Sequence, residues 1–137
     1  TGDSTYTRLV EGALATGSEL SSRAPSMFAH WLMAHLLAHE GLAQLAVVGD
    51  PQADDSRRLL EVVDRTYRPN LVVALRPPGS VTVVPLLEGR EPSVPVTASA
   101  NDHPTAQPRA TAWLCRRSTC APATDRPETL RALLDDV

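Results

Sequence analysis

Two cysteines close together in the chain have the clearest chemical potential of any side chains in this sequence. Cys115 and Cys120 are the only cysteines, and Arg116 and Arg117 directly follow the first. Three interpretations are open: two reduced structural thiols, a disulfide or redox-sensing pair, and two metal ligands. A redox dithiol of the thioredoxin type has two residues between its cysteines at a helix N-terminus, whereas four residues separate this pair. The adjacent arginines would favour a thiolate, so we regard Cys115 and Cys120 as redox candidates.

A metal site would require ligands beyond these two thiols. Structural zinc takes four ligands, and the chain has no second cysteine pair. His35 and His39 have the i, i+4 spacing that lets two imidazoles share a zinc ion on one helix, but Leu36 stands where the zinc-protease motif has Glu. His35 also falls on an apolar stripe with Trp31, which favours histidines packed in a core or an interface. We predict no metal, with His35 and His39 as the remaining candidates.

The sequence lacks the residues that characterise several enzyme classes. None of the 13 basic residues is Lys, which removes Schiff-base chemistry and a phosphate-binding P-loop. The chain has neither a G-x-G-x-x-G nucleotide motif nor a G-x-S-x-G nucleophile motif. A helix N-terminus predicted near Asp54 could bind an anion, but Asp50, Asp54 and Asp55 are acidic where a phosphate would lie. We therefore predict no cofactor and assign no catalytic residue.

Composition narrows the possible partners and compartment. The 137 residues fit one domain, and 42% of them are hydrophobic, which is enough for a core. A net charge of −3 gives no general attraction to nucleic acid or to anionic membranes. No apolar run approaches the roughly 20 residues of a membrane span, and the first residues do not resemble a signal peptide. We expect a cytoplasmic chain cut from a longer protein.

The first 42 residues are predicted to form a helical hairpin. Apolar residues recur at spacings of three and four over residues 4–22 and again over residues 25–40. Pro25 suits the first turn of the second helix, and Gly41 suits its C-terminal cap. The second helix is so apolar that it needs cover on more than one side.

Residues 43–137 are predicted to form a small α/β domain. The apolar runs at 44–48 and 70–75 flank an amphipathic helix over residues 54–67, which is the pattern of a βαβ unit. A third strand at 81–84 is possible, and residues 91–110 are rich in proline and without periodicity, as in a long loop. A strand at 111–115 precedes a last helix, for which Asp125 and Glu128 have the spacing of a capping box. We expect a mainly parallel sheet of three or four strands with flanking helices.

Five pieces of sequence also occur in a characteristic order: Thr1-Gly-Asp-Ser-Thr-Tyr6, Val47-Val-Gly-Asp-Pro51, Arg68-Pro-Asn70, Pro85-Leu-Leu-Glu-Gly-Arg90, and Ala112-Trp-Leu-Cys115 with Cys120 and Pro122. Together they resemble the C-terminal end of the YyaL/spermatogenesis-associated thioredoxin-domain family. The resemblance implies a parent protein with a thioredoxin-like domain, an (α/α)6 toroid similar to sugar epimerases and glycosidases, and a small α/β tail. It implies that residues 1–42 are the closing hairpin of the toroid and that no family catalytic residue lies in this chain. The segment at 91–110 is longer than the linker that the resemblance leads us to expect.

Three functions follow as hypotheses. The first is a non-catalytic α/β tail that packs against the remainder of the parent chain, the toroid and thioredoxin-like domain, or mediates assembly such as homo-oligomers. The second is a thiol redox partner of the thioredoxin-like domain, acting through Cys115 and Cys120. The third is a part of a carbohydrate-active toroid enzyme, to which Trp31 and His35 would be the local contributors.

Overall fold

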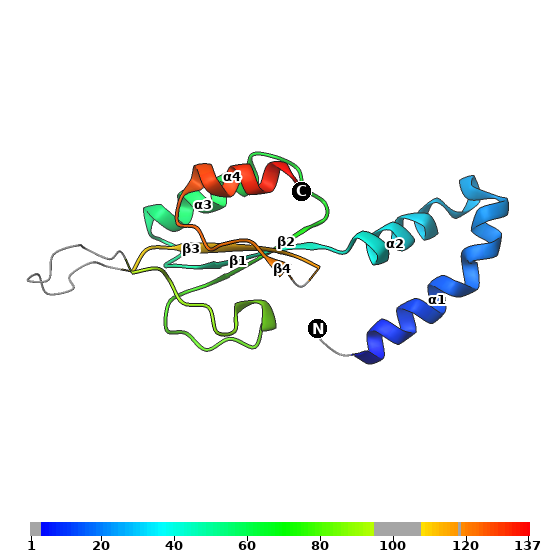
Figure 1. Cartoon of the computed structure of the whole chain (residues 1–137), viewed down its shortest axis with the longest axis horizontal. Helices are drawn as coiled ribbons and strands as arrows, with labels where there is room; N and C mark the ends of the chain where they lie inside the picture. Colours follow the sequence, from blue (N-terminus) through cyan, green and yellow to red (C-terminus); the bar gives the residue numbers. More distant parts are fainter. Residues whose placement is uncertain (1–3, 95–107, 118) are drawn as a thin grey trace, which may run out of the picture. The chain divides into compact units, whose positions relative to one another are not determined.

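The computed structural model describes residues 4–94, 108–117 and 119–137, and divides the chain into two compact units. The first unit is Thr1–Leu42 and the second is Ala43–Val137. The first is helical, and the second combines helices with a four-stranded sheet, which confirms the predicted α/β class (Figure 1). Among the helices of the described residues, none is both long enough and apolar enough to cross a membrane.

The first unit is the predicted pair of helices, α1 (Ser4–Arg23) and α2 (Ala29–Glu40), joined by the 3₁₀ turn η1 (Pro25–Phe28). The helices approach closely at Gly17, where an added Cβ would lie 2.3 Å from Cε2 of Trp31. Gly41 has φ +75° and its N–H binds the carbonyl of Leu37, so it ends α2 as expected for a glycine cap. Glycine is therefore required at one position for space and at the other for backbone conformation.

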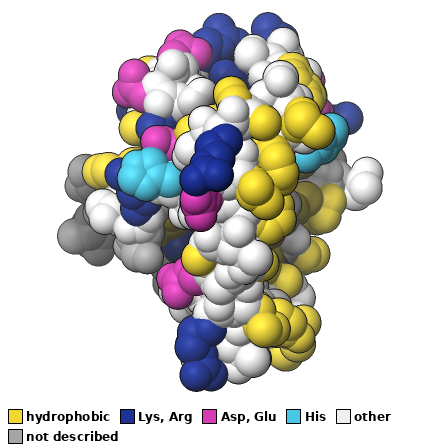
Figure 2. Space-filling model, turned by 90° about the vertical axis from the view of Figure 1, so that its right-hand side faces the viewer, with side chains coloured by type: hydrophobic (Ala, Val, Ile, Leu, Met, Phe, Trp, Pro, Cys, Tyr) yellow, Lys and Arg dark blue, Asp and Glu magenta, His cyan; other side chains and the backbone are white. Residues whose placement is uncertain are grey.

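Much of the apolar surface of this hairpin is exposed. The side chains of α1 that become buried are Leu14, Gly17 and Ser21, and α2 buries none of its residues fully. The space-filling view shows hydrophobic side chains gathered in a band (Figure 2). Exposed hydrophobic residues of the two helices and their turn include Leu9, Val10, Leu20, Met27, Met33 and Leu36. The hairpin thus satisfies the helical pattern of its sequence without burying all of its apolar side chains.

The second unit is built around a buried central strand, β1 (Ala43–Val48). The helix α3 (Asp54–Asp64) leads from it to β2 (Leu71–Arg76), which pairs parallel to β1 from Ala43↔Leu71 to Val48↔Arg76. This is the predicted βαβ unit, although α3 ends three residues earlier than expected. Strand β1 tolerates a nearly continuous apolar sequence because it has neighbours on both edges and cover on both faces.

The other half of the sheet is antiparallel, unlike the mainly parallel sheet expected from the sequence. Strand β3 (Thr111–Arg116) pairs antiparallel with β1, and β4 (Thr119–Cys120) pairs antiparallel with β3, giving the order β2-β1-β3-β4. The chain leaves β2 at the end of the sheet that holds Val48, and Thr111 pairs with Val48 at that same end. A connection that returns to the end it left must bring in an antiparallel strand, whereas a parallel one needs a full crossover.

The two faces of this sheet are covered differently. Helices α3 and α4 (Pro127–Asp135) lie together on one face (Figure 1). Their core includes Leu45, Val47, Leu59, Val62, Leu130 and Leu134. The 3₁₀ turn η2 (Pro85–Leu87) packs on the opposite face, where Leu87 joins Ala46 and Val48 with Trp113 against them. The sheet therefore has a helical face and an η2 face.

Two local predictions in this unit are wrong. Residues 81–84 form no strand, and Val81 and Val83 are 97% and 91% exposed, because this segment leaves the sheet to reach η2. Asp125 does not cap the last helix, whose N-cap residue is Arg126 and whose first turn holds Pro127. Thr124 is tied to Ala112 by two backbone hydrogen bonds, so the chain still belongs to the sheet there and the helix starts later. The long loop expected at 91–110 falls largely on 95–107, outside the described residues.

Candidate functional site

The two cysteines face each other across the outer strand pair of the sheet. Cys115 of β3 is in register with Cys120 of β4, and their sulfurs form a disulfide. The interpretation as two reduced structural thiols is therefore wrong for this state of the protein. The short strand β4 was not predicted, and it is what brings the pair together, because the turn after Arg116 reverses the chain. Arg117 occupies that turn with φ +45°, which is uncommon for a residue other than glycine.

The disulfide lies on the η2 face, and its two cysteines differ in exposure. Cys115 pairs with Gln44 of β1, two positions along the strand from Trp113, so both β3 residues belong to the η2 face. Cys115 is only 5% exposed, whereas Cys120 on the outer strand is exposed. One sulfur of the disulfide is therefore carried by a core residue and the other by a surface residue.

Arg90 is the charged group of this site. One of its guanidinium nitrogens lies 3.3 Å from Sγ of Cys115 and 3.5 Å from Sγ of Cys120. Its Nε donates a hydrogen bond of 2.6 Å to the carbonyl of Leu86, and its guanidinium carbon lies 5.5 Å from the centre of the Trp113 ring. A planar guanidinium can make these contacts together, whereas a lysine ammonium could not. A cation held against two sulfurs stabilises either of them as a thiolate.

Arg76, at the end of β2, holds the backbone of Arg90 in place. The side chain of Arg76 is only 7% exposed and donates hydrogen bonds to the carbonyls of Ser80 and Arg90. It also lies 3.2 Å from the carboxylate of Glu91. The segment from residue 77 to residue 91 is thereby folded back onto the sheet edge. Through this segment the position of Arg90 depends on a buried arginine of the core.

A small cavity opens beside the disulfide. Its volume is about 210 Å³, and its lining residues are Gln44, Leu86, Arg90, Cys115, Arg117 and Cys120. Of this described lining, Arg90 is the charged residue that contacts the two sulfurs. The sequence pointed to Arg116 and Arg117 as the neighbours of a thiolate, whereas in the structure Arg90 contacts both sulfurs. Arg90 was missed as a site residue because 25 residues separate it from Cys115.

The histidine candidates lie in the helical hairpin. The Nε2 atom of His35 is 3.1 Å from the carbonyl oxygen of Leu14. A carbonyl only accepts, so this nitrogen must carry the proton and cannot also bind a metal. Over the described part of the chain, no group of three His, Cys, Asp or Glu residues is arranged to hold a metal ion. His35 therefore joins the two helices of the hairpin, and His39 has no ligand set around it in the described residues.

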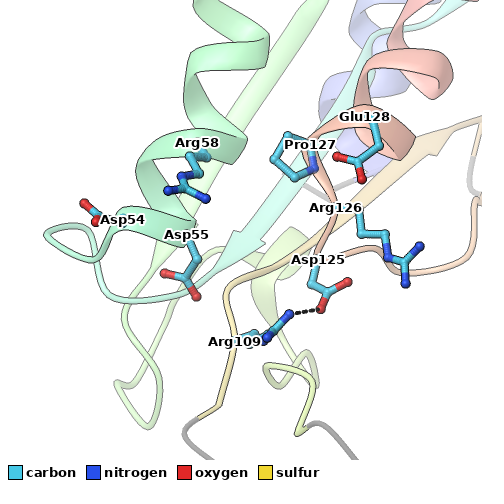
Figure 3. Close-up of a pocket in the computed structure, with 8 residues that line it drawn as sticks. All are labelled: Asp54, Asp55, Arg58, Arg109, Asp125, Arg126, Pro127 and Glu128. Carbon is cyan, nitrogen blue, oxygen red and sulfur yellow. Dashed lines mark ion pairs between the residues drawn. The ribbon is translucent and has the colours of Figure 1, made fainter.

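A larger cavity lies between the N-terminal ends of α3 and α4. It measures about 580 Å³ and is lined by Asp54, Asp55, Arg58, Arg109, Asp125, Arg126, Pro127 and Glu128 (Figure 3). Arg109 and Asp125 form an ion pair of 3.7 Å within it, while Asp55 accepts hydrogen bonds from the backbone N–H groups of Ser56 and Ala110. Its acids stand where an anion would meet the helix ends, as the sequence suggested. The charges in this cavity are of both signs, and several are engaged with the protein itself.

Comparison with known proteins adds no family to this geometry. No protein-family model, no curated protein and no solved structure matches the chain.

Proposed function

We propose that residues 43–137 form a non-catalytic α/β domain whose cysteine pair is a reversible thiol–disulfide switch. The observation that carries this proposal is the guanidinium of Arg90 at 3.3 Å and 3.5 Å from the two sulfurs. The thiolate is the reactive form in disulfide exchange, and a neighbouring cation favours it. Cys120 is an exposed residue on the outer strand, and this position favours access of a reaction partner to the bond.

The electrons for this switch would come from a dithiol. Two successive exchange steps convert the Cys115–Cys120 disulfide into two thiols and the donor dithiol into its disulfide, with two electrons and two protons transferred. The sequence resemblance supports a thioredoxin-like domain of the parent chain as this donor. A switch of this kind also suits the proposed cytoplasmic location, where disulfides are mostly transient and redox-responsive.

The reduction midpoint of the pair tests this function. The full chain is equilibrated in buffers of graded dithiol/disulfide ratio, acid-quenched and alkylated, and its free thiols are counted by mass. Structural disulfides have potentials below about −300 mV, and we expect the Cys115–Cys120 couple to lie above that value. Arg90→Gln should lower the midpoint, because it removes the cation that stabilises the reduced form. Arg58→Gln, an exposed arginine of α3, serves as the matched control and should leave it unchanged.

Two outcomes would contradict the switch. One is a midpoint well below about −300 mV, which would make the bond a static structural link. The other is an equal midpoint in the wild-type chain and in Arg90→Gln, which would mean that the contact to both sulfurs has no electrostatic effect on the couple.

A second role, docking to the remainder of the parent chain or to another copy, is favoured by the apolar surface of the same unit. Five valines between the start of β2 and η2 have exposed side chains: Val72, Val73, Val81, Val83 and Val84. β2 is also an edge strand, with unpaired backbone groups along one side. Sedimentation velocity at increasing concentration tests self-association. Val83→Asp should abolish any association without loss of the fold, and unchanged association would exclude this surface.

The carbohydrate hypothesis gains no support from the hairpin. Trp31 packs against Gly17, and His35 binds the carbonyl of Leu14, so both side chains serve the contact between α1 and α2. Neither side chain lines any of the cavities found among the described residues.

A further inference from the structure

We infer that the switch opens in one direction only, by attack of a small, carboxylate-bearing thiol on Sγ of Cys120, with Cys115 as the leaving thiolate. This inference rests on the proposed function and adds to it the reacting sulfur and a second class of electron donor, small acidic thiols, beside the thioredoxin-like dithiol.

The burial of the two cysteines selects the attacked sulfur. In disulfide exchange the incoming thiolate approaches along the line of the bond, from the side opposite the leaving sulfur. Attack on Cys115 is disfavoured, because that residue is only 5% exposed and pairs with central strand β1. Cys120 lies on the outer strand and is exposed as a residue, which favours it as the site of attack.

The step conserves atoms and electrons. An external thiolate R–S⁻ forms a bond to Sγ of Cys120 while the bond between Cys120 and Cys115 breaks. The electron pair of that bond leaves with Cys115 as a thiolate, and the products are the mixed disulfide R–S–S–Cys120 and Cys115–S⁻. A second thiolate R–S⁻ then attacks the R sulfur of the mixed disulfide, which releases R–S–S–R and leaves both cysteines reduced.

Arg90 is placed to receive the charge that develops in this step. Its nitrogen is 3.3 Å from Sγ of Cys115, the sulfur on which the negative charge appears. Stacking on Trp113 and the hydrogen bond to Leu86 hold the guanidinium there before the reaction begins. A cation already in position stabilises a departing thiolate without having to reorganise.

The cavity beside the disulfide defines the partner. Arg90, which lies 3.3 Å and 3.5 Å from the two sulfurs and lines the cavity, favours a negatively charged group next to the thiol. Its volume of about 210 Å³ is below the roughly 300–1,000 Å³ typical of pockets for drug-sized ligands. The cavity therefore suits a short mercapto acid, or one acidic arm of a larger thiol.

Exchange rates with three small thiols of different charge test the partner class. The oxidised full chain is treated at low salt with 3-mercaptopropionate, 2-mercaptoethanol or cysteamine, and the rates are compared at equal thiolate concentration. We expect the anionic thiol to react about fivefold faster than the neutral one, and the cationic thiol to be slowest. Arg90→Gln should reduce this preference, while Arg58→Gln should preserve it. Equal rates for all three thiols would overturn the assignment of an acidic partner.

Mapping the trapped intermediate tests the direction. Acid quenching, alkylation of free thiols and peptide mass analysis should find the adduct on Cys120 and the alkyl group on Cys115. As a second measurement, an aromatic disulfide carrying carboxylates should react readily with Cys120 in Cys115→Ser, and at least tenfold more slowly with Cys115 in Cys120→Ser. Adducts on Cys115 would overturn the direction. If none of the thiols opens the disulfide, the proposed switch itself is wrong. This outcome differs from adducts on Cys115, which would contradict only the direction of opening.

Discussion

The carboxylate of Asp55 binds the backbone N–H of Ala110 over 2.7 Å, and so joins the first turn of α3 to the residue before β3. The other carboxylate oxygen accepts the N–H of Ser56 at 2.8 Å. Ala110 is almost fully buried, so its N–H has no access to water as an alternative acceptor. One side chain at the edge of the larger cavity thereby fixes where the chain re-enters the sheet.

Asp55→Ala should lower the free energy of unfolding by about 1–3 kcal/mol, because it leaves a buried backbone donor without an acceptor. Asp54→Ala is the matched control: this neighbouring acid makes an exposed pair with Arg57, worth at most about 0.5 kcal/mol. Urea unfolding followed by circular dichroism measures both. Equal losses in the two variants would show that the bond to Ala110 contributes nothing.

Gly17→Ala and Gly12→Ala should change the hairpin in opposite directions. An added methyl at Gly17 would collide with the indole of Trp31 and should cost about 1–3 kcal/mol by overpacking. Gly12 lies on the same helix with nothing within 4 Å of its added Cβ, so alanine should gain about 0.5–1 kcal/mol of helix stability. Thermal loss of the helical signal at 222 nm measures the effect. Stabilisation by both changes would rule out the close contact.

Two buried hydroxyls should respond differently to removal. Ser56 is fully buried, and its Oγ has no hydrogen-bond partner among the described residues. Thr111 is equally buried, but its Oγ1 contacts the N–H and hydroxyl of Ser93 and the carbonyl of Arg109. Ser56→Ala should therefore be neutral or slightly stabilising, while Thr111→Val should cost about 1–3 kcal/mol. Urea midpoints of the two variants provide the measurement, and a large loss in Ser56→Ala would contradict this assignment.

Arg76→Gln should weaken both the fold and the switch. The loss of its bonds to the carbonyls of Ser80 and Arg90 should cost about 1–3 kcal/mol. It should also slow thiol exchange, because the backbone of Arg90 loses its anchor. Arg57→Gln removes an arginine of similar length from an exposed pair and should alter neither property. A destabilised Arg76→Gln variant with unchanged exchange kinetics would show that Arg90 is held by other contacts alone.

Local sequence pattern was sufficient for the βαβ half of the sheet. The change from a helical period to a short apolar run marks β1, and Pro25 and Gly41 mark the limits of the second helical segment. These features are set by residues close together in the chain. The direction of β3 could not be predicted in this way, because it depends on the end of the sheet at which β3 begins, with Thr111 beside Val48.

The candidate site was only half visible in the sequence for the same reason. The cysteines stand out by type and spacing, but the two-residue strand β4 is too short to have a period. Arg90 contacts the sulfurs from a turn that precedes Cys115 by 25 residues and Cys120 by 30. Nothing in the local sequence distinguishes it from the other arginines among the 13. Its place in the segment of residues 85–90 that carries the family resemblance was the one signal that could have found it.

The disulfide closes a ring between residues only five positions apart. So short a ring restricts the unfolded chain far less than a long one, and the entropy lost on closing it corresponds to at most about 2 kcal/mol. The five register pairs between β3 and β1 are separate from the S–S bond, so we expect them to persist when the ring is open. The proposed oxidation and reduction should therefore alternate many times without the polypeptide passing through denaturation.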